Sequence, residues 1–415
     1  MRVDKKVNTF SLFLVFMFTL LALLNNIYGY LTGLVLVFIL GIKNFKKVIS
    51  IKSVLIFPYY VLVIYGLLIT AIVPRNIKFE IMDFIRGALG VSNFLVFLVL
   101  GRLISLMYTP KKFFKNLCYF GIIYVVYVFY ELFTSSLGQD QVLSNLSSAR
   151  SVGNSTPLFL PFVLILVMYD KYLFKIFRKK EKLIYIILIS VTILLTFSRT
   201  VYLCFFALIS IFLLFSFNSK ILVSSVRYIL IYAFCFLLFI GIIPSSIRNE
   251  LLIKLVNSLN EGSSQSNWNV MANVNTDWRG FENYSALNQY HTSIFFNKLF
   301  GNGLDSGIYV GSYAILLGLS TVYISYLHNS FFTVLIKMGS VGLIFYLLYF
   351  IVNSTFLIKK ISQNILYILP VCLLVSLVIS SLVVQGVVVA GHDCLNITLL
   401  GYLSNKKNYN EGNFL

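Results

Sequence analysis

Long apolar runs separated by short polar segments occupy most of the chain. An α-helix rises 1.5 Å per residue, so a run of about 20 apolar residues crosses the roughly 30 Å of hydrocarbon in a bilayer. The predicted fold class is therefore an all-α, polytopic integral membrane protein. About twelve spans are predicted, near residues 10–25, 27–42, 53–73, 87–107, 117–137, 157–176, 183–198, 200–217, 228–244, 328–352, 364–386 and 387–403.

One polar segment, residues 245–327, is far longer than the others. Loops of more than about 15 residues without spans of their own are usually functional or disordered. The pattern divides one membrane domain into 1–244 with the first nine spans, 245–327 as a large extracytoplasmic loop, and 328–415 with the last three spans and a short tail. The stretch 308–327 is apolar, but its Tyr, Ser and Gly content favours an outer loop or re-entrant segment.

Two amphipathic helices are expected inside this loop, because apolar residues recur there at helical spacing. Arg279 and Glu282 are predicted on the wetter side of the second helix, and Phe300-Gly301-Asn302-Gly303 predicts a break after it. The apolar positions are Ile247, Leu251, Leu252, Leu255, Val256 and Leu259 in the first helix, and Trp278, Phe281, Tyr284 and Leu287 in the second.

Composition excludes a water-soluble globular protein. The chain has 415 residues, of which 59% are hydrophobic and only 11% charged, and its mean hydropathy is +0.89. The net charge of +19 comes from short cationic clusters between apolar runs, and no nucleic-acid module is present, so nucleic acid is not an expected partner. Most of these cations fall in alternate connections, which predicts cytoplasmic N- and C-termini by the positive-inside rule.

The outer segments differ from the inner ones in the kind of cation they carry. Most inner cations are lysines, whereas the outer set is Arg75, Arg86, Arg150, Arg199, Arg248 and Arg279 against Lys78, Lys254 and Lys298. A guanidinium group binds two phosphate or carboxylate oxygens at once, so this preference indicates anion binding outside the membrane. Chance or contact with lipid headgroups remains the alternative explanation.

Four short stretches resemble the O-antigen polymerase and ligase family, the Wzy-type glycan-joining enzymes of bacterial envelopes. They are Thr196-Phe197-Ser198-Arg199-Thr200, Arg279 with Leu299-Phe300-Gly301-Asn302-Gly303, Leu327-His328-Asn329-Ser330 with Lys337-Met338-Gly339-Ser340-Val341-Gly342-Leu343, and Arg150-Ser151-Val152-Gly153-Asn154-Ser155-Thr156-Pro157. The last stretch departs from the family's "N-P-N" element, because Ser155-Thr156 precede the proline and Leu158 follows it. The resemblance covers roughly residues 145–350.

The resemblance implies a polysaccharide polymerase for O-antigen or capsule repeat units. Such an enzyme transfers an undecaprenyl-diphosphate-linked glycan to a hydroxyl of another lipid-linked unit on the outer face of the bacterial cytoplasmic membrane. The implied partners are that lipid-linked oligosaccharide, membrane lipid, and a chain-length regulator and flippase of the same pathway. A ligase that moves finished glycan to a lipid, wall or protein acceptor, and a non-enzymatic flippase, remain alternatives.

The implied site combines cations with one histidine. His328 is the expected base, because an imidazole titrates near neutral pH, and Arg199 and Arg279 would stabilise the departing diphosphate. Arg150, Arg86 and Lys337 are expected to bind the substrate diphosphate, and Asn329 and Glu282 to orient the substrate or the imidazole. Asp277 or Glu282 could replace His328 as base, whereas a local structural role is expected for the adjacent His392 and Asp393. No metal or other cofactor is expected, because the histidines are scattered and neither a D-x-D pair nor a P-loop occurs.

Overall fold

In the computed structural model, the described residues are 2–24, 27–42, 55, 57–73, 81–138, 157–215, 219–243, 245–260, 268–317 and 321–405. Nearly all of them are helical, in agreement with the predicted fold class. The β-structure within these ranges is one antiparallel pair of short strands, β1 (Ile308–Tyr309) and β2 (Tyr323–Ile324), in which Ile308 pairs with Ile324.

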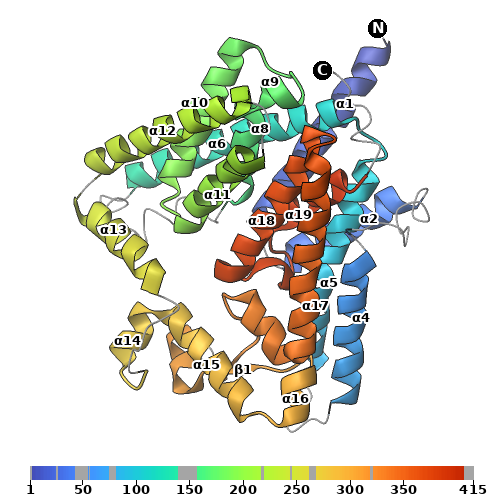
Figure 1. Cartoon of the computed structure of the whole chain (residues 1–415), viewed down its shortest axis with the longest axis vertical. Helices are drawn as coiled ribbons and strands as arrows, with labels where there is room; N and C mark the ends of the chain where they lie inside the picture. The colour runs from blue at the N-terminus through green and yellow to red at the C-terminus, as the bar shows by residue number, and fades with distance from the viewer. Residues whose placement is uncertain are drawn as a thin grey trace.

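The helices form a bundle with a smaller unit at one end (Figure 1). The smaller unit holds α14, α15 and α16 with the strand pair, at the end opposite to the beginning of α1; α13 leads to it from α12, and α17 leads from it back into the bundle. The bounds are α1 (Arg2–Leu23), α2 (Ile27–Gly41), α4 (Phe57–Ile72), α5 (Ile81–Ile104), α6 (Pro110–Gly138), α8 (Phe159–Met168), α9 (Asp170–Leu173), α10 (Lys179–Leu195), α11 (Arg199–Phe215), α12 (Ser219–Ile242), α13 (Ser245–Asn260), α14 (Met271–Thr276), α15 (Trp278–Thr292), α16 (Phe295–Phe300), α17 (Ser330–Ile361), α18 (Ile368–Val383) and α19 (Cys394–Leu403).

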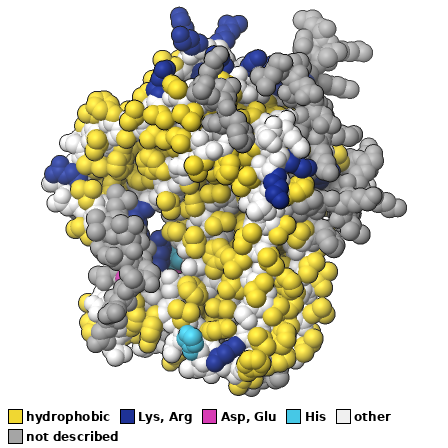
Figure 2. Space-filling model, viewed as in Figure 1, with side chains coloured by type: hydrophobic (Ala, Val, Ile, Leu, Met, Phe, Trp, Pro, Cys, Tyr) yellow, Lys and Arg dark blue, Asp and Glu magenta, His cyan; other side chains and the backbone are white. Residues whose placement is uncertain are grey.

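Several helices have the length and composition of membrane spans. Among the described residues, five segments are long and apolar enough to cross a bilayer: Ile81–Ile104, Pro110–Glu131, Ile221–Ile242, Ser330–Ile361 and Ile365–Val383. Six apolar helices are shorter, at 10–17 residues: Leu12–Leu23, Ile27–Gly41, Pro58–Ile72, Phe159–Met168, Arg199–Phe215 and Cys394–Leu403. Figure 2 shows a broad hydrophobic surface, with many Lys and Arg side chains gathered at the end where α1 begins. The chain is therefore a helical protein suited to a membrane.

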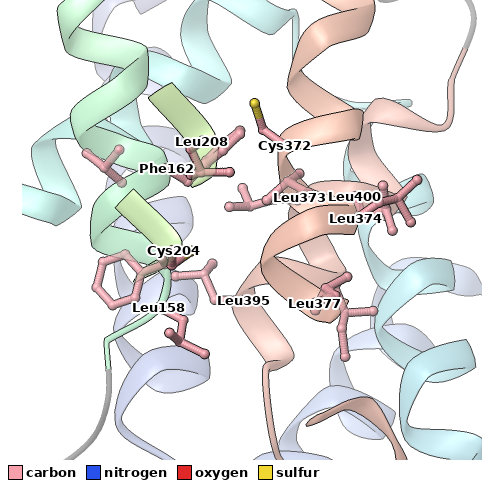
Figure 3. Packing of buried hydrophobic residues seen from close by; sticks show 14 of the residues in the cluster. Leu158, Phe162, Cys204, Leu208, Cys372, Leu373, Leu374, Leu377, Leu395 and Leu400 are labelled. Atoms are coloured by element: carbon pink, nitrogen blue, oxygen red, sulfur yellow. The ribbon is translucent and has the colours of Figure 1, made fainter. Parts of the chain in front are cut away.

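The core of the bundle surrounds α18. This helix packs against α11, α17 and α19. In its most apolar 18-residue stretch 72% of the residues are buried, whereas the corresponding share in α12 is only 17%. Figure 3 shows Phe162 of α8, Leu208 of α11, Leu373 of α18 and Leu395 of α19 meeting in this core. Because lipid tails are as apolar as leucine, such helices are held together by close packing rather than by exclusion of water.

Two glycines allow α5 and α19 to cross at close range. A Cβ atom on Gly101 would lie 1.9 Å from the Thr398 carbonyl oxygen, and one on Gly401 would lie 2.2 Å from the Leu98 carbonyl oxygen. Small residues at such crossings bring two backbones together within a membrane. The close contact fixes α19 along α5, which also carries part of the site described below.

The helix α17 is broken at Gly339, whose φ of 68° and ψ of −173° are not helical. The rings of Phe331 and Tyr346 lie 5.3 Å apart, centroid to centroid. A continuous helix would separate these residues by about 22 Å, at 1.5 Å per residue. The segment before Gly339 therefore folds back along the segment after it. This hairpin replaces the straight span predicted at 328–352, and uninterrupted helix runs from 340 to 361.

The smaller unit has a hydrophobic core of its own. Val274, Phe281, Ile308, Leu327 and Ile336 are buried together, so α14, α15, the strand pair and the first part of α17 pack as one body. The strand pair occupies part of the apolar stretch that follows α16.

Candidate functional site

The site is centred on a contact between Glu282 of α15 and His328, which precedes α17. The Nδ1 atom of His328 lies 2.9 Å from Oε2 and 3.1 Å from Oε1 of Glu282, and the backbone N–H of His328 donates to Oε2 over 3.0 Å. The Trp278 indole N–H donates to Oε1 over 2.6 Å. The Glu282 side chain is only 3% exposed, whereas that of His328 is 36% exposed. A carboxylate accepts hydrogen bonds, so Nδ1 carries the proton in neutral His328 and Nε2 is left as an acceptor.

The local sequence explains how α15 presents this carboxylate. Asp277 caps the helix by accepting from the Gly280 N–H over 2.9 Å, and Trp278 lies one helical turn before Glu282. The predicted orientation of the helix was wrong, because Glu282 is buried while Tyr284 is 50% exposed. The hydrogen bonds to Trp278 and His328 make burial of the carboxylate favourable, which a pattern of apolar residues does not reveal.

Arg279 lies near Glu282 along the same helix. The two positions are i and i+3, so they project from neighbouring parts of the helix surface. Arg279 is half-buried and lies at the start of α15. Its backbone position is therefore one helical turn from that of Glu282.

Asn329, expected to orient the imidazole or a sugar, caps α17 instead. Its Oδ1 atom accepts from the Phe331 N–H over 3.0 Å, which satisfies one of the free amide groups at the start of that helix. Glu282 is the group that orients the His328 ring. The cap holds the chain immediately after His328 and so contributes to the position of the imidazole only through the backbone.

Lys337 lies inside the fold rather than facing a wet cavity. It is 5% exposed, and its Nζ donates to the carbonyl oxygens of Leu304 and Ser306 over 2.7 and 2.8 Å. The backbone of the loop also binds this helix, because the Gly303 N–H donates to the Lys337 carbonyl over 3.0 Å. The ammonium group therefore joins the loop after α16 to the hairpin of α17, a structural role in place of the predicted contact with diphosphate.

The glycine motifs of this loop and of α17 meet backbone to backbone. Gly301 and Gly303 have φ of 90° and 94°, a region that glycine enters without strain. A Cβ atom on Gly339 would lie 2.3 Å from the Leu299 carbonyl oxygen and 2.5 Å from the Gly301 nitrogen. The glycines therefore permit the close contact that folds α17 back.

Arg199 begins α11 after the sharp turn at Phe197, whose φ is 48°. In the same helix, Cys204 Sγ lies 3.0 Å from Ser376 Oγ of α18. Figure 3 shows the two helices running in opposite directions, with Leu208 near Cys372. Arg199 is five residues before Cys204, and Ser381 is five residues after Ser376. Because the helices are antiparallel, Arg199 lies at about the same depth along the bundle as Ser381, near the C-terminal end of α18.

The start of α17 lies at this same level. The Gly386 backbone packs against Ser381, and the Ser330 hydroxyl donates to the Gln385 carbonyl. Arg199 and His328 are therefore at similar depth along the bundle. Figure 2 shows a hollow near the smaller unit in which basic side chains and a histidine are visible. Arg150 lies outside the described residues.

Arg86 lies near the beginning of α5 and forms an exposed ion pair with Asp83, at 3.3 Å. Its backbone carbonyl accepts from the Tyr326 hydroxyl over 2.5 Å, which ties α5 to the segment that carries His328. Burial raises the pKa of Tyr326, so this phenol remains a hydrogen-bond donor. The backbone of Arg86, and not its side chain, thus binds the segment that precedes His328.

The connection between α18 and α19 also approaches His328, which sequence reasoning missed. The Gln385 N–H donates to the His328 carbonyl over 2.8 Å. Burial lowers the pKa of His392 in this connection, and the nearby His328 lowers it further. The adjacent His392 and Asp393, near the outer end of the last predicted span, were the available sequence signal, and a local structural role was predicted for them.

No protein-family model matches the chain, and no curated protein matches it. Within the described ranges, no group of three or more His, Cys, Asp or Glu side chains is placed to hold a metal ion. The geometry thus offers an oriented imidazole, a buried carboxylate and arginines, within a helical membrane protein.

Proposed function

We propose that the chain is a polysaccharide polymerase that joins undecaprenyl-diphosphate-linked glycan units on the outer face of a bacterial cytoplasmic membrane. The observation that carries this proposal is the Glu282–His328 contact at 2.9 Å, with Arg279 one turn away on α15. A carboxylate that holds Nδ1 leaves Nε2 free to accept a proton, the arrangement that general-base catalysis requires.

The chemistry follows from these charges. The acceptor hydroxyl would give its proton to Nε2 of His328 as its oxygen bonds to the anomeric carbon of the donor glycan. The bond from that carbon to the diphosphate oxygen would break, and the electron pair would leave with the diphosphate. Glu282 would stabilise the imidazolium, and Arg279 and Arg199 would stabilise the negative charge on the leaving group.

Substrate binding is assigned to further cations. Arg86 and Arg150 are proposed to hold the diphosphate before reaction, because guanidinium groups stay charged at any relevant pH. Lys337 is not retained for this role, since its ammonium group is buried against two carbonyl oxygens. The chain-length regulator and the flippase of the pathway are proposed partners.

The proposed topology has about twelve crossings with both termini in the cytoplasm. The cations gathered at the end where α1 begins support this orientation. The Glu282–His328 pair belongs to the smaller unit at the opposite end, so it would face outward. Lipid-linked units that have been moved across the membrane would meet the site there.

The direct test is polymerisation by the purified protein. The protein in detergent would be incubated with a synthetic undecaprenyl-diphosphate oligosaccharide, without nucleotide, and the products separated by size. A ladder of longer glycans is expected from the wild type, and none from His328→Ala. His291→Ala is the control, because this exposed histidine lies on the same helix as Glu282 but about 14 Å further along it.

The alternatives give different products. Transfer of one intact glycan to an added non-lipid-linked acceptor, without a ladder, would identify a ligase. Movement of the lipid-linked unit across reconstituted vesicles without new glycosidic bonds would identify a flippase. A ladder that persists at the wild-type rate in His328→Ala would remove the proposed base.

A further inference from the structure

The connection between α18 and α19, residues 384–393, holds a histidine to which the proposed reaction assigns no role. This segment begins beside the site, where the Gln385 N–H donates to the His328 carbonyl over 2.8 Å. It continues through a short 3₁₀ turn, Gly386–Val388, and ends at His392 and Asp393 before α19. His392 therefore follows, by seven positions, the residue that binds the His328 backbone.

Asn93 of α5 fixes the end of this connection. Its Nδ2 donates to the carbonyl of His392 over 3.0 Å, and its Oδ1 accepts from the Gly391 N–H over 2.9 Å. Asn93 is fully buried, so its amide has no competing water. A buried amide that binds the backbone on both sides of one peptide group determines where His392 lies.

The segment with His328 packs on the same stretch of α5. A Cβ atom on Gly90 would lie 2.4 Å from the Val388 carbonyl and 2.6 Å from the Tyr326 hydroxyl, so both segments touch this glycine. Asn93 lies three residues further along the helix, about 4.5 Å in rise. One short stretch of α5 therefore holds both histidine-bearing segments against each other.

The contacts that fix the backbone of His392 do not hold its imidazole ring. Among the residues that the structure describes, no side chain or backbone group hydrogen-bonds its ring nitrogens. Neither nitrogen is sealed from solvent, so the half-buried ring reaches accessible space. The neighbouring Asp393 is not available to it, since its Oδ2 accepts from the Ser380 hydroxyl.

We propose that His392 is a substrate-binding residue of the same site and hydrogen-bonds a hydroxyl of the glycan beside the one that His328 deprotonates. The inference rests on the proposed function. A neutral imidazole has one donor and one acceptor, which matches a sugar hydroxyl that also donates and accepts. The lowered pKa of His392 is consistent with this role, because the ring then stays uncharged near neutral pH and leaves the proton transfer to His328.

The test combines two variants with a set of acceptors that each lack one hydroxyl. For the wild type, one of these deoxy analogues should lose about tenfold in kcat/KM, the usual scale of one hydrogen bond to a buried partner. His392→Phe should show the same loss with the complete acceptor and no further loss with that analogue. Most of the loss should appear in KM, and His392→Gln, which retains a donor and an acceptor, should recover part of it.

The outcomes separate the two proposals. An active wild type, with His392→Phe and His392→Gln both unchanged in KM for every acceptor, would overturn the assignment of His392 alone. Equal losses in His392→Phe with all acceptors would also overturn it, since a structural defect does not select one hydroxyl. A wild type without product would overturn the proposed function and this inference together.

Discussion

The side chain of Glu282 combines two properties that rarely occur together, burial and charge. Three hydrogen bonds from Trp278 and His328 compensate its removal from water. A carboxylate so held can stabilise a neighbouring imidazolium without moving. The surrounding donors therefore hold the carboxylate in place beside the His328 ring.

Glu282→Gln should preserve the shape of this contact and remove its charge. The amide cannot stabilise an imidazolium, so kcat in the polymerisation assay should fall by roughly 10²-fold or more. The melting temperature should also fall, because the amide nitrogen would face a donor that a carboxylate oxygen accepts in the wild type. Glu181→Gln provides the control, because this exposed carboxylate accepts from the Arg178 N–H, outside the site. An unchanged kcat in Glu282→Gln would show that the carboxylate has no part in proton transfer.

Asp393 gives a prediction about stability and pH. Burial raises the pKa of this carboxyl from 3.8 to about 6, against hydrogen bonds from Ser380 and Asn396 that lower it. The protonated form is thus favoured in the folded protein, so its stabilising contribution is complete below the ordinary pKa and is lost as pH rises through about 6. Asp393→Asn should melt near the wild type at about pH 4 and above it at about pH 7.5. Parallel melting curves at both pH values would contradict this account.

At the scale of elements, the hairpin of α17 depends on Gly339. A side chain there would meet the Leu299 carbonyl at 2.3 Å, and the backbone has a positive φ of 68°. Helical packing elsewhere leaves room for a methyl group, as at Gly241 of α12, where a Cβ atom would meet nothing within 4 Å. The two glycines thus differ in environment although both lie in apolar helices.

Gly339→Ala should lower the melting temperature in detergent, by an amount that corresponds to about 1–3 kcal/mol from strain and overpacking. Gly241→Ala is the matched control and should leave the melting temperature unchanged or raise it, since alanine favours helix over glycine by about 1 kcal/mol. Equal melting temperatures for the two variants would mean that the fold-back does not require glycine.

For the whole molecule, the arrangement of the two ends predicts which positions can be reached from outside the cell. The exposed Tyr309 belongs to the smaller unit, and the exposed Lys359 lies at the far end of α17. In a variant without native cysteines, Tyr309→Cys should react with an impermeant thiol reagent in intact cells, and Lys359→Cys only after permeabilisation. The reverse pattern would place the site in the cytoplasm and end the proposal of an outer-face polymerase.

The local features of this chain followed from sequence because their causes are local. Helices formed where apolar runs were predicted, and the predicted break at Gly301 ends α16, although α15 had already ended at Thr292. Two helices of the loop, α13 and α15, were also expected from their spacing. Hydropathy and backbone freedom act over a few residues, so a single sequence reveals them.

Contacts between distant segments were decided only by the tertiary structure. Residues 282 and 328 are far apart in sequence, and an amphipathic pattern cannot say that a carboxylate turns inward to meet an imidazole. The hairpin at Gly339 is hidden because both of its arms are apolar, and the position of His392 depends on an amide from α5. Sequence determined which segments are helical and apolar, while the meeting of charges at the site required packing between elements that no local preference encodes.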